Sequence, residues 1–236
     1  MMKITQEFDQ PQIDDLEQEI TNQLKKLNLE NKIHLNETVA ITGGSRGIHQ
    51  IDFILKTTVS FFQNLGARPF IFPAMGSHGG GTAKGQKAIL KNYGITESTM
   101  NCPIRATMDV EIIGKTNLGT PVFLDKYASQ ADHIFVVNRI KLHTKLSGKV
   151  ESGLMKMCLI GMGKKQGART YHRAIAHHSW DTIVQAVTKI ITSKAPILGG
   201  LAIIQNAHEE IAHLIGVPVN QFQKEEQIGR ASCRER

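Results

Sequence analysis

Two histidines follow short segments rich in the apolar and β-branched residues that favour strands. His78 lies in the glycine-rich segment 74–82, directly after the run 69–73. His143 follows the run 132–138 in the same way. An imidazole accepts and donates protons near neutral pH, and a pair on opposite faces of one substrate is what inversion of a carbon centre requires. A lone histidine is more often structural, so the pair is what predicts acid–base chemistry.

A lysine and a cysteine lie in one apolar segment farther along the chain. Lys156 stands among apolar residues, where an amine is costly to desolvate, and partly desolvated lysines are common sites of covalent attachment. Cys158 is expected to be a small buried hydrophobe. The glycines and lysines of 161–167 are by themselves typical of a solvated loop. Lys156 is therefore the residue of this region for which we expect chemistry.

The segments around these residues alternate between helical and strand patterns. We expect helices over residues 13–27, 48–65 and 83–93, and strands over 38–42, 69–73, 132–138 and 201–205. The alternation predicts an α/β fold, a mainly parallel sheet with helices on both faces. Ligands of such sheets bind outside the carboxyl ends of the strands, so the polar loops after the first three strands should meet at one rim. Thr82 is expected to cap the helix after the glycine loop.

Composition narrows the class of protein. The chain has 236 residues, 41% of them hydrophobic and 21% charged, enough for a globular core. The net charge is +7, but the positively charged residues are scattered along the chain and aromatic residues make up only 6%, so we expect no nucleic-acid partner. No apolar run of membrane-spanning length occurs, and three cysteines are too few for a disulfide framework. These features favour a cytoplasmic protein that does not bind a membrane.

Taken together and in order from about Gly43 to His172, these segments resemble the lactate racemase-like family. Its members are racemases and epimerases of 2-hydroxy acids, isomerases that use a nickel-pincer nucleotide. The resemblance implies a Rossmann-like N-terminal domain of a two-domain enzyme. It also implies a 2-hydroxy acid as the small-molecule substrate and cofactor-synthesis proteins as partners.

The resemblance also assigns the residues that hold the cofactor. Ser152 to Lys156 is similar to the family's SGGxK stretch, so Lys156 is expected to carry the cofactor through a thioamide, with Ser152 and Gly153 beside it. His172 is expected to be the nickel ligand, since imidazole suits nickel, and His177 and His178 are its alternatives.

Roles toward the substrate follow from the same comparison. His78 and His143 resemble the paired residues that remove and return the hydroxyl proton while hydride moves to and from the cofactor. Arg46 matches an arginine that faces substrate and phosphate, and Ser45 adjoins it among the cofactor-binding residues. Gly43 and Leu142 depart from the family's pattern, which favours a 2-hydroxy acid other than lactate.

Residues 228–236 resemble the translation of a sequencing adapter, so we expect the catalytic domain to span residues 1–227 and its C-terminal domain to be missing. A hydride intermediate needs a cover that excludes water, and the isolated domain is therefore expected to have little activity. Two other functions remain open. One is a metal-dependent hydrolase with His78, His143 and His172 as ligands, and the other is a non-catalytic module that binds a nucleotide phosphate at the glycine loops.

Overall fold

The computed structural model describes residues 11–141 and 152–227. Its helices are α1 (Leu16–Lys25), α2 (Ile51–Asn64), α3 (Ala83–Asn92), α4 (Glu97–Met100), α5 (Lys126–Ser129), α6 (Leu154–Lys156), α7 (Lys164–Ala174) and α8 (Trp180–Lys194). Its strands are β1 (Thr38–Gly43), β2 (Arg68–Pro73), β3 (Val110–Lys115), β4 (Pro121–Asp125), β5 (His133–Arg139), β6 (Ile197–Gln205) and β7 (Ile211–Pro218).

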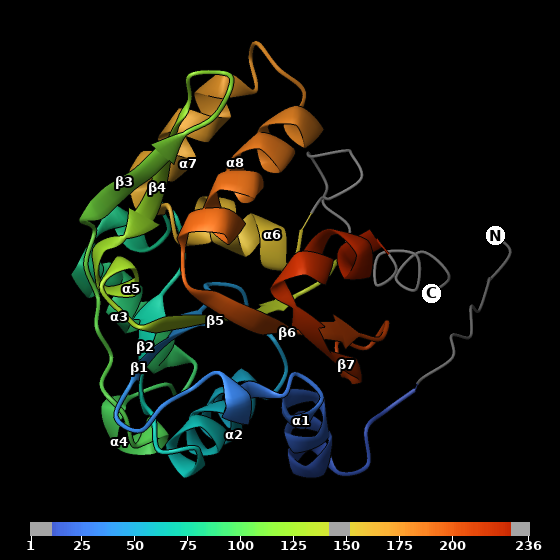
Figure 1. The fold of residues 1–236 in the computed structure, drawn as a ribbon. Coiled ribbons are helices and arrows are strands. Elements are labelled where there is room, and N and C mark those ends of the chain that lie inside the picture. The colour runs from blue at the N-terminus through green and yellow to red at the C-terminus, as the bar shows by residue number, and fades with distance from the viewer. Residues whose placement is uncertain (1–10, 142–151, 228–236) are drawn as a thin grey trace, which may run out of the picture.

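The described strands form a five-stranded sheet in the order β2-β1-β5-β6-β7 and a separate hairpin of β3 and β4 (Figure 1). The pairs β1–β2, β1–β5 and β5–β6 are parallel, and β7 runs antiparallel to β6. The prediction of a mainly parallel α/β sheet is confirmed.

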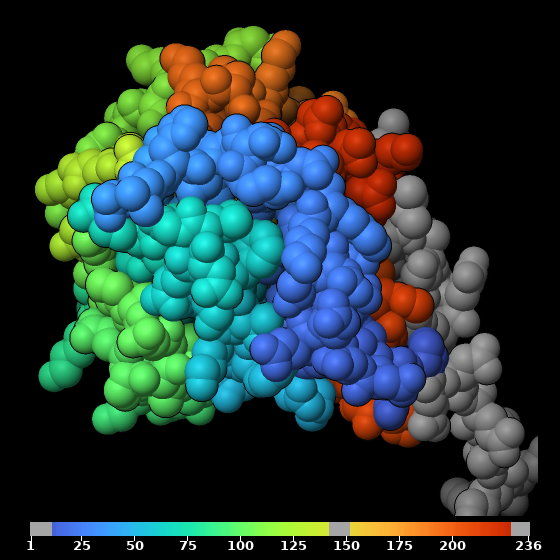
Figure 2. Space-filling view, turned by 60° about the horizontal axis from the view of Figure 1, so that its bottom comes forward, coloured from blue at the N-terminus to red at the C-terminus, as the bar shows by residue number. Residues whose placement is uncertain are grey.

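Helices cover both faces of the sheet because its strands are apolar on both sides. On β1, Ala40 packs into one core, whereas Val39 and Ile41 pack into the other. Helices α1 and α2 cover the second core, and Figure 2 looks onto this side, with α1 in blue and α2 in cyan. Helices α7 and α8 and the hairpin β3–β4 lie on the opposite side (Figure 1). The expected two-sided packing is therefore present.

The predicted helices and strands are confirmed with small shifts at their ends, except that β6 begins four residues earlier than predicted. The hairpin β3–β4, the edge strand β7 and the helices α4 to α8 are additions to them. Strand β3 is mostly solvent-facing, and its Ile112 is 61% exposed. A half-buried strand is recognised in a sequence by alternating apolar and polar residues, and the sequence of the exposed strand β3 lacks this alternation. In the described part of the chain, no helix has both the length and the apolar character needed to cross a membrane.

The order of the strands fixes where a ligand can bind. After β1 the chain adds β2 on one side of it, and β5 later pairs with its other side. Main-chain pairing of β1 with β5 stops at Ile41 opposite Phe135. Beyond it the Thr42 hydroxyl bridges the two strands, since it accepts from the N–H of Val137 at 2.8 Å and donates to the Val137 carbonyl at 3.2 Å. In open α/β sheets, ligands bind at the carboxyl ends of the strands, at the point where the chain changes from one side of the first strand to the other.

Candidate active site

The loop after β1 carries Ser45 and Arg46 to this edge of the sheet. The Tyr93 hydroxyl at the end of α3 donates a hydrogen bond of 2.9 Å to the Ser45 carbonyl and so anchors the loop. The Ser45 hydroxyl is hydrogen-bonded to Nδ1 of His78, which belongs to the loop after β2. The first two of the three polar loops therefore meet, as the sequence predicted.

The glycine loop that carries His78 is folded tightly onto the start of α3. Gly79 has a φ of +64°, and a Cβ at this position would lie 2.7 Å from the backbone nitrogen of Gln86, so only glycine fits here. Thr82 caps α3 by accepting from the N–H of Gly85 at 3.1 Å, as predicted. The Gln86 side chain donates to the carbonyls of Gly76 and His78, at 2.9 and 3.3 Å. These contacts with the backbone of the loop fix the position of His78.

Lys156 approaches the same edge from the segment that follows β5. The side chain of Asn138, near the end of β5, donates to the Gly153 carbonyl at 2.8 Å and holds the start of α6. A Cβ on Gly44 would lie 3.3 Å from the Met157 side chain, so the loop after β1 packs against the residue that follows Lys156. A π-helical turn, Met157–Gly161, follows at once, a distortion found often at functional sites.

The charges of these residues act on one another. Burial, together with smaller contributions from the positive charges of Arg46 and Lys141, lowers the pKa of Lys156 to about 8. Burial also lowers the pKa of His78, with smaller contributions from Arg46 and Lys156. Two loops and the helix α6 thus bring an imidazole, a guanidinium and a partly desolvated amine into one electrostatic neighbourhood. Its positive field favours an anionic ligand such as a carboxylate or a phosphate.

A buried lysine beneath this site corrects one sequence expectation. Lys164 is fully buried and forms an ion pair of 3.0 Å with Asp125, whose side chain is also fully buried. Its ammonium donates to the carbonyl of Pro73 and to Oε1 of Gln86. The expectation of a solvated loop over 161–167 was therefore wrong for Lys164, because a carboxylate distant in sequence supplies the partner that a buried ammonium requires. No local signal announces that partner.

A family model described as the lactate racemase N-terminal domain matches residues 3–183. The chain belongs to this family. Its fold is similar to the structure of the lactate racemase apoprotein from Thermoanaerobacterium thermosaccharolyticum, with a TM-score of 0.62 and 15% sequence identity. The match covers 89% of this chain and 54% of that one, so the chain spans about half the length of that protein. A comparison with curated protein sequences gave no match.

The residues that the resemblance assigns to the site can now be located in the structure. Ser45, Arg46, His78 and Lys156 lie together, and Ser152 and Gly153 lead into α6. His143 lies outside the described residues. His172 is on the exposed side of α7, next to the buried Tyr171, and His177 and His178 are also exposed. Between 11 and 141 and between 152 and 227, no three His, Cys, Asp or Glu side chains cluster as metal ligands.

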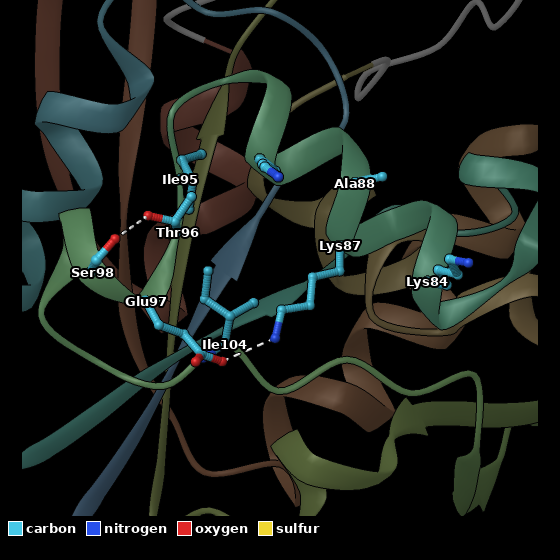
Figure 3. Close-up of a pocket in the computed structure, with 9 residues that line it drawn as sticks. Lys84, Lys87, Ala88, Ile95, Thr96, Glu97, Ser98 and Ile104 are labelled. Atoms are coloured by element: carbon cyan, nitrogen blue, oxygen red, sulfur yellow. Dashed lines mark hydrogen bonds and ion pairs between the residues drawn. The ribbon is translucent and has the colours of Figure 1, made fainter.

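A hollow of about 550 Å³ lies beside α3 and is lined by none of the candidate site residues (Figure 3). An ion pair of 3.0 Å between Lys87 and Glu97 lies beside Ile104, one of the buried residues of its wall. The hollow is lined by Lys84, Lys87, Ala88, Lys91, Ile95, Thr96, Glu97, Ser98 and Ile104. Neither His78 nor Lys156 borders it, so we assign it no part in the candidate active site.

Proposed function

We propose that this chain is the N-terminal catalytic domain, residues 1–227, of an enzyme that racemises or epimerises a 2-hydroxy acid with a tethered nickel-pincer nucleotide. The observation that carries the proposal is the convergence of His78, Arg46 and Lys156 at the carboxyl ends of the central strands, in a member of the lactate racemase N-terminal domain family. The activity is proposed for the whole enzyme, since the chain spans about half of the lactate racemase that it matches.

The residues present fit a tethered anionic cofactor. Lys156 is half-buried, and a pKa of about 8 leaves roughly a tenth of its amine uncharged at pH 7, which is the form that attacks an acyl group. Arg46 and Lys141 add the positive charge that a phosphate needs. His172 is the proposed nickel ligand, and its exposure on α7 leaves it accessible. When bound, the group supplies the acceptance and return of hydride at the substrate carbon.

The chain's own side chains then have separate tasks. His78 accepts the proton of the substrate hydroxyl, because its lowered pKa keeps the ring uncharged near neutral pH. Ser45 holds Nδ1 of that ring, which leaves Nε2 to face the substrate. Arg46 pairs with the substrate carboxylate, for which a planar guanidinium is well suited. His143 is the proposed second acid–base group, which serves the opposite face of the planar 2-keto acid.

Mass spectrometry of Lys156 tests the proposal. Protein produced together with the cofactor-synthesis enzymes should carry nickel and an added mass on the peptide that contains Lys156. Lys156→Ala should lose both the added mass and racemisation of 2-hydroxy acids, whereas Lys189→Ala, a change of an exposed lysine on α8, should keep both. An unmodified Lys156 peptide in active, nickel-loaded enzyme would overturn the assignment.

The same preparation separates the two alternative functions. A zinc-containing protein with hydrolytic activity and no organic chromophore would support a metal-dependent hydrolase. Nucleotide binding that survives Lys156→Ala, without any loss of optical purity in a 2-hydroxy acid, would support a phosphate-binding module.

A further inference from the structure

A chain of buried polar contacts connects the loop that carries His78 to the segment that carries Lys156. The amide nitrogen of Gln86 donates to the carbonyls of Gly76 and His78, and its amide oxygen accepts from Lys164. Lys164 also donates to the carbonyl of Pro73, the last residue of β2. Gln86 and Lys164 are both 0% exposed, so water does not compete for these bonds.

The backbones of the two segments are also in direct contact. The N–H of Gly76 donates to the Gly161 carbonyl at 3.2 Å. A Cβ on Gly161 would lie 2.7 Å from the carbonyl oxygen of Ala74, so glycine is what permits this approach. Gly161 ends the π-helical turn that begins directly after Lys156. A shift of one segment would therefore displace the other.

Lys164 has little freedom to move within this network. Its partner Asp125 also caps α5, where its carboxylate accepts from the N–H groups of Tyr127 at 2.8 Å and Ala128 at 3.1 Å. A buried ammonium that left this carboxylate would lose its compensating charge. The lysine is thus fixed between β4 and β2, at the start of α7.

We propose that Gln86 and Lys164 are positioning residues that lock the His78 loop against the Lys156 segment and so set the separation between the base and the cofactor tether. This inference rests on the proposed function for its catalytic consequence. The lock itself concerns only contacts within the chain, and it can be tested without cofactor.

The first test is a side-chain NMR titration of His78 in the 236-residue chain, with the signal assigned by its loss in His78→Ala. Gln86→Met keeps the length of the side chain and the Lys164–Asp125 pair, but removes both hydrogen bonds to the loop. The released ring should become more hydrated and move away from Arg46 and Lys156, so the pKa of His78 should rise. Thr58→Val, which removes a buried hydroxyl bond to Ile54 on α2, is the matched control and should leave the titration unchanged.

A second variant keeps the test valid if removing a single buried partner prevents folding. Lys164→Met combined with Asp125→Asn removes both charges, and the asparagine oxygen can still accept the α5 cap bonds. This double variant should raise the pKa of His78 in the same way. An unchanged titration in both Gln86→Met and the double variant would overturn the proposal.

The second test is kinetic and uses the cofactor-loaded enzyme. Gln86→Met should lower kcat by roughly 10- to 100-fold, the loss expected when a catalytic group is misplaced by about an ångström, with little change in KM and normal modification of Lys156. Because Ser45 also acts through His78, the losses from Gln86→Met and Ser45→Ala should combine less than additively. Strict additivity, or a loss confined to thermal stability, would reduce Gln86 to a structural residue. If the enzyme had no racemase activity at all, the proposed function would fail while the NMR test of the lock still stood.

Discussion

The hydroxyl of Ser45 and Nδ1 of His78 are hydrogen-bonded, and they join the loops that follow two adjacent parallel strands. A ring held at Nδ1 presents its other nitrogen in one orientation, so Ser45 orients the proposed base.

The two partners of this bond should differ in how much activity they support. His78→Ala should lower turnover by roughly 10²- to 10⁴-fold, the usual contribution of an acid–base group, whereas Ser45→Ala should cost about tenfold because the base remains. Steady-state kinetics on cofactor-loaded enzyme provide the measurement, and Ser77→Ala, an exposed neighbour, is the control. Near-normal turnover of His78→Ala would make that histidine structural.

His143 should be as necessary as His78 if two bases serve opposite faces of the substrate. His143→Ala should abolish racemisation and leave the added mass on Lys156 intact. His34→Ala, a change of an exposed histidine before β1, should retain activity and serves for comparison. Racemisation at the normal rate without His143 would contradict a two-histidine mechanism.

Nickel retention should depend on His172. His172→Ala is expected to lose nickel, measured by elemental analysis, while the organic mass on Lys156 remains. His177→Ala is the matched control, since both histidines are exposed. If nickel were lost only from the His177 variant, the ligand assignment would move to that residue.

Lys156 should react as an unusually acidic lysine. Burial and the charge of Arg46 lower its pKa to about 8, so acylation of the folded chain should rise with pH around 8, well below the range of the same lysine in the unfolded chain. Arg46→Met removes a positive neighbour and should raise the pKa of Lys156, shifting the profile to higher pH. Peptide mass spectrometry after brief acylation at a series of pH values measures both, and coincident profiles for folded and unfolded chain would disprove the effect.

Glu226 should make the fold less stable as pH rises. Its carboxyl is 3% exposed and accepts from the N–H of Met155, and burial raises its pKa to about 8. Between about pH 4.5 and 8 the folded chain therefore holds a proton that the unfolded chain releases, so the free energy of unfolding falls as pH rises through this range.

Glu226→Gln should flatten this dependence, because an amide needs no proton to stay neutral. Urea denaturation at several pH values gives the free energy of unfolding, and Glu225→Gln, at the less buried neighbouring position, is the control. An unchanged slope in Glu226→Gln would show that another group is responsible.

The sequence by itself determined the local units and much of the chemistry. The apolar runs that became β1, β2 and β5 were predicted within a residue or two, because apolar segments of this length must be buried. The cap at Thr82 follows from residue type at a helix start. Lys156 was predicted to be partly desolvated from its apolar neighbours alone, and its lowered pKa agrees with that prediction.

Only the tertiary structure decided which strands pair and which distant side chains are in contact. The strand β5 pairs with β1 rather than with β2, and this order depends on the packing of the whole sheet instead of on any local period. The burial of Lys164 depended on Asp125, a partner almost forty residues earlier in the chain. Hydrophobic periodicity indicates which face of a helix or strand is buried. The partner of a buried charged group, in contrast, comes from a distant segment that meets it only in the folded chain.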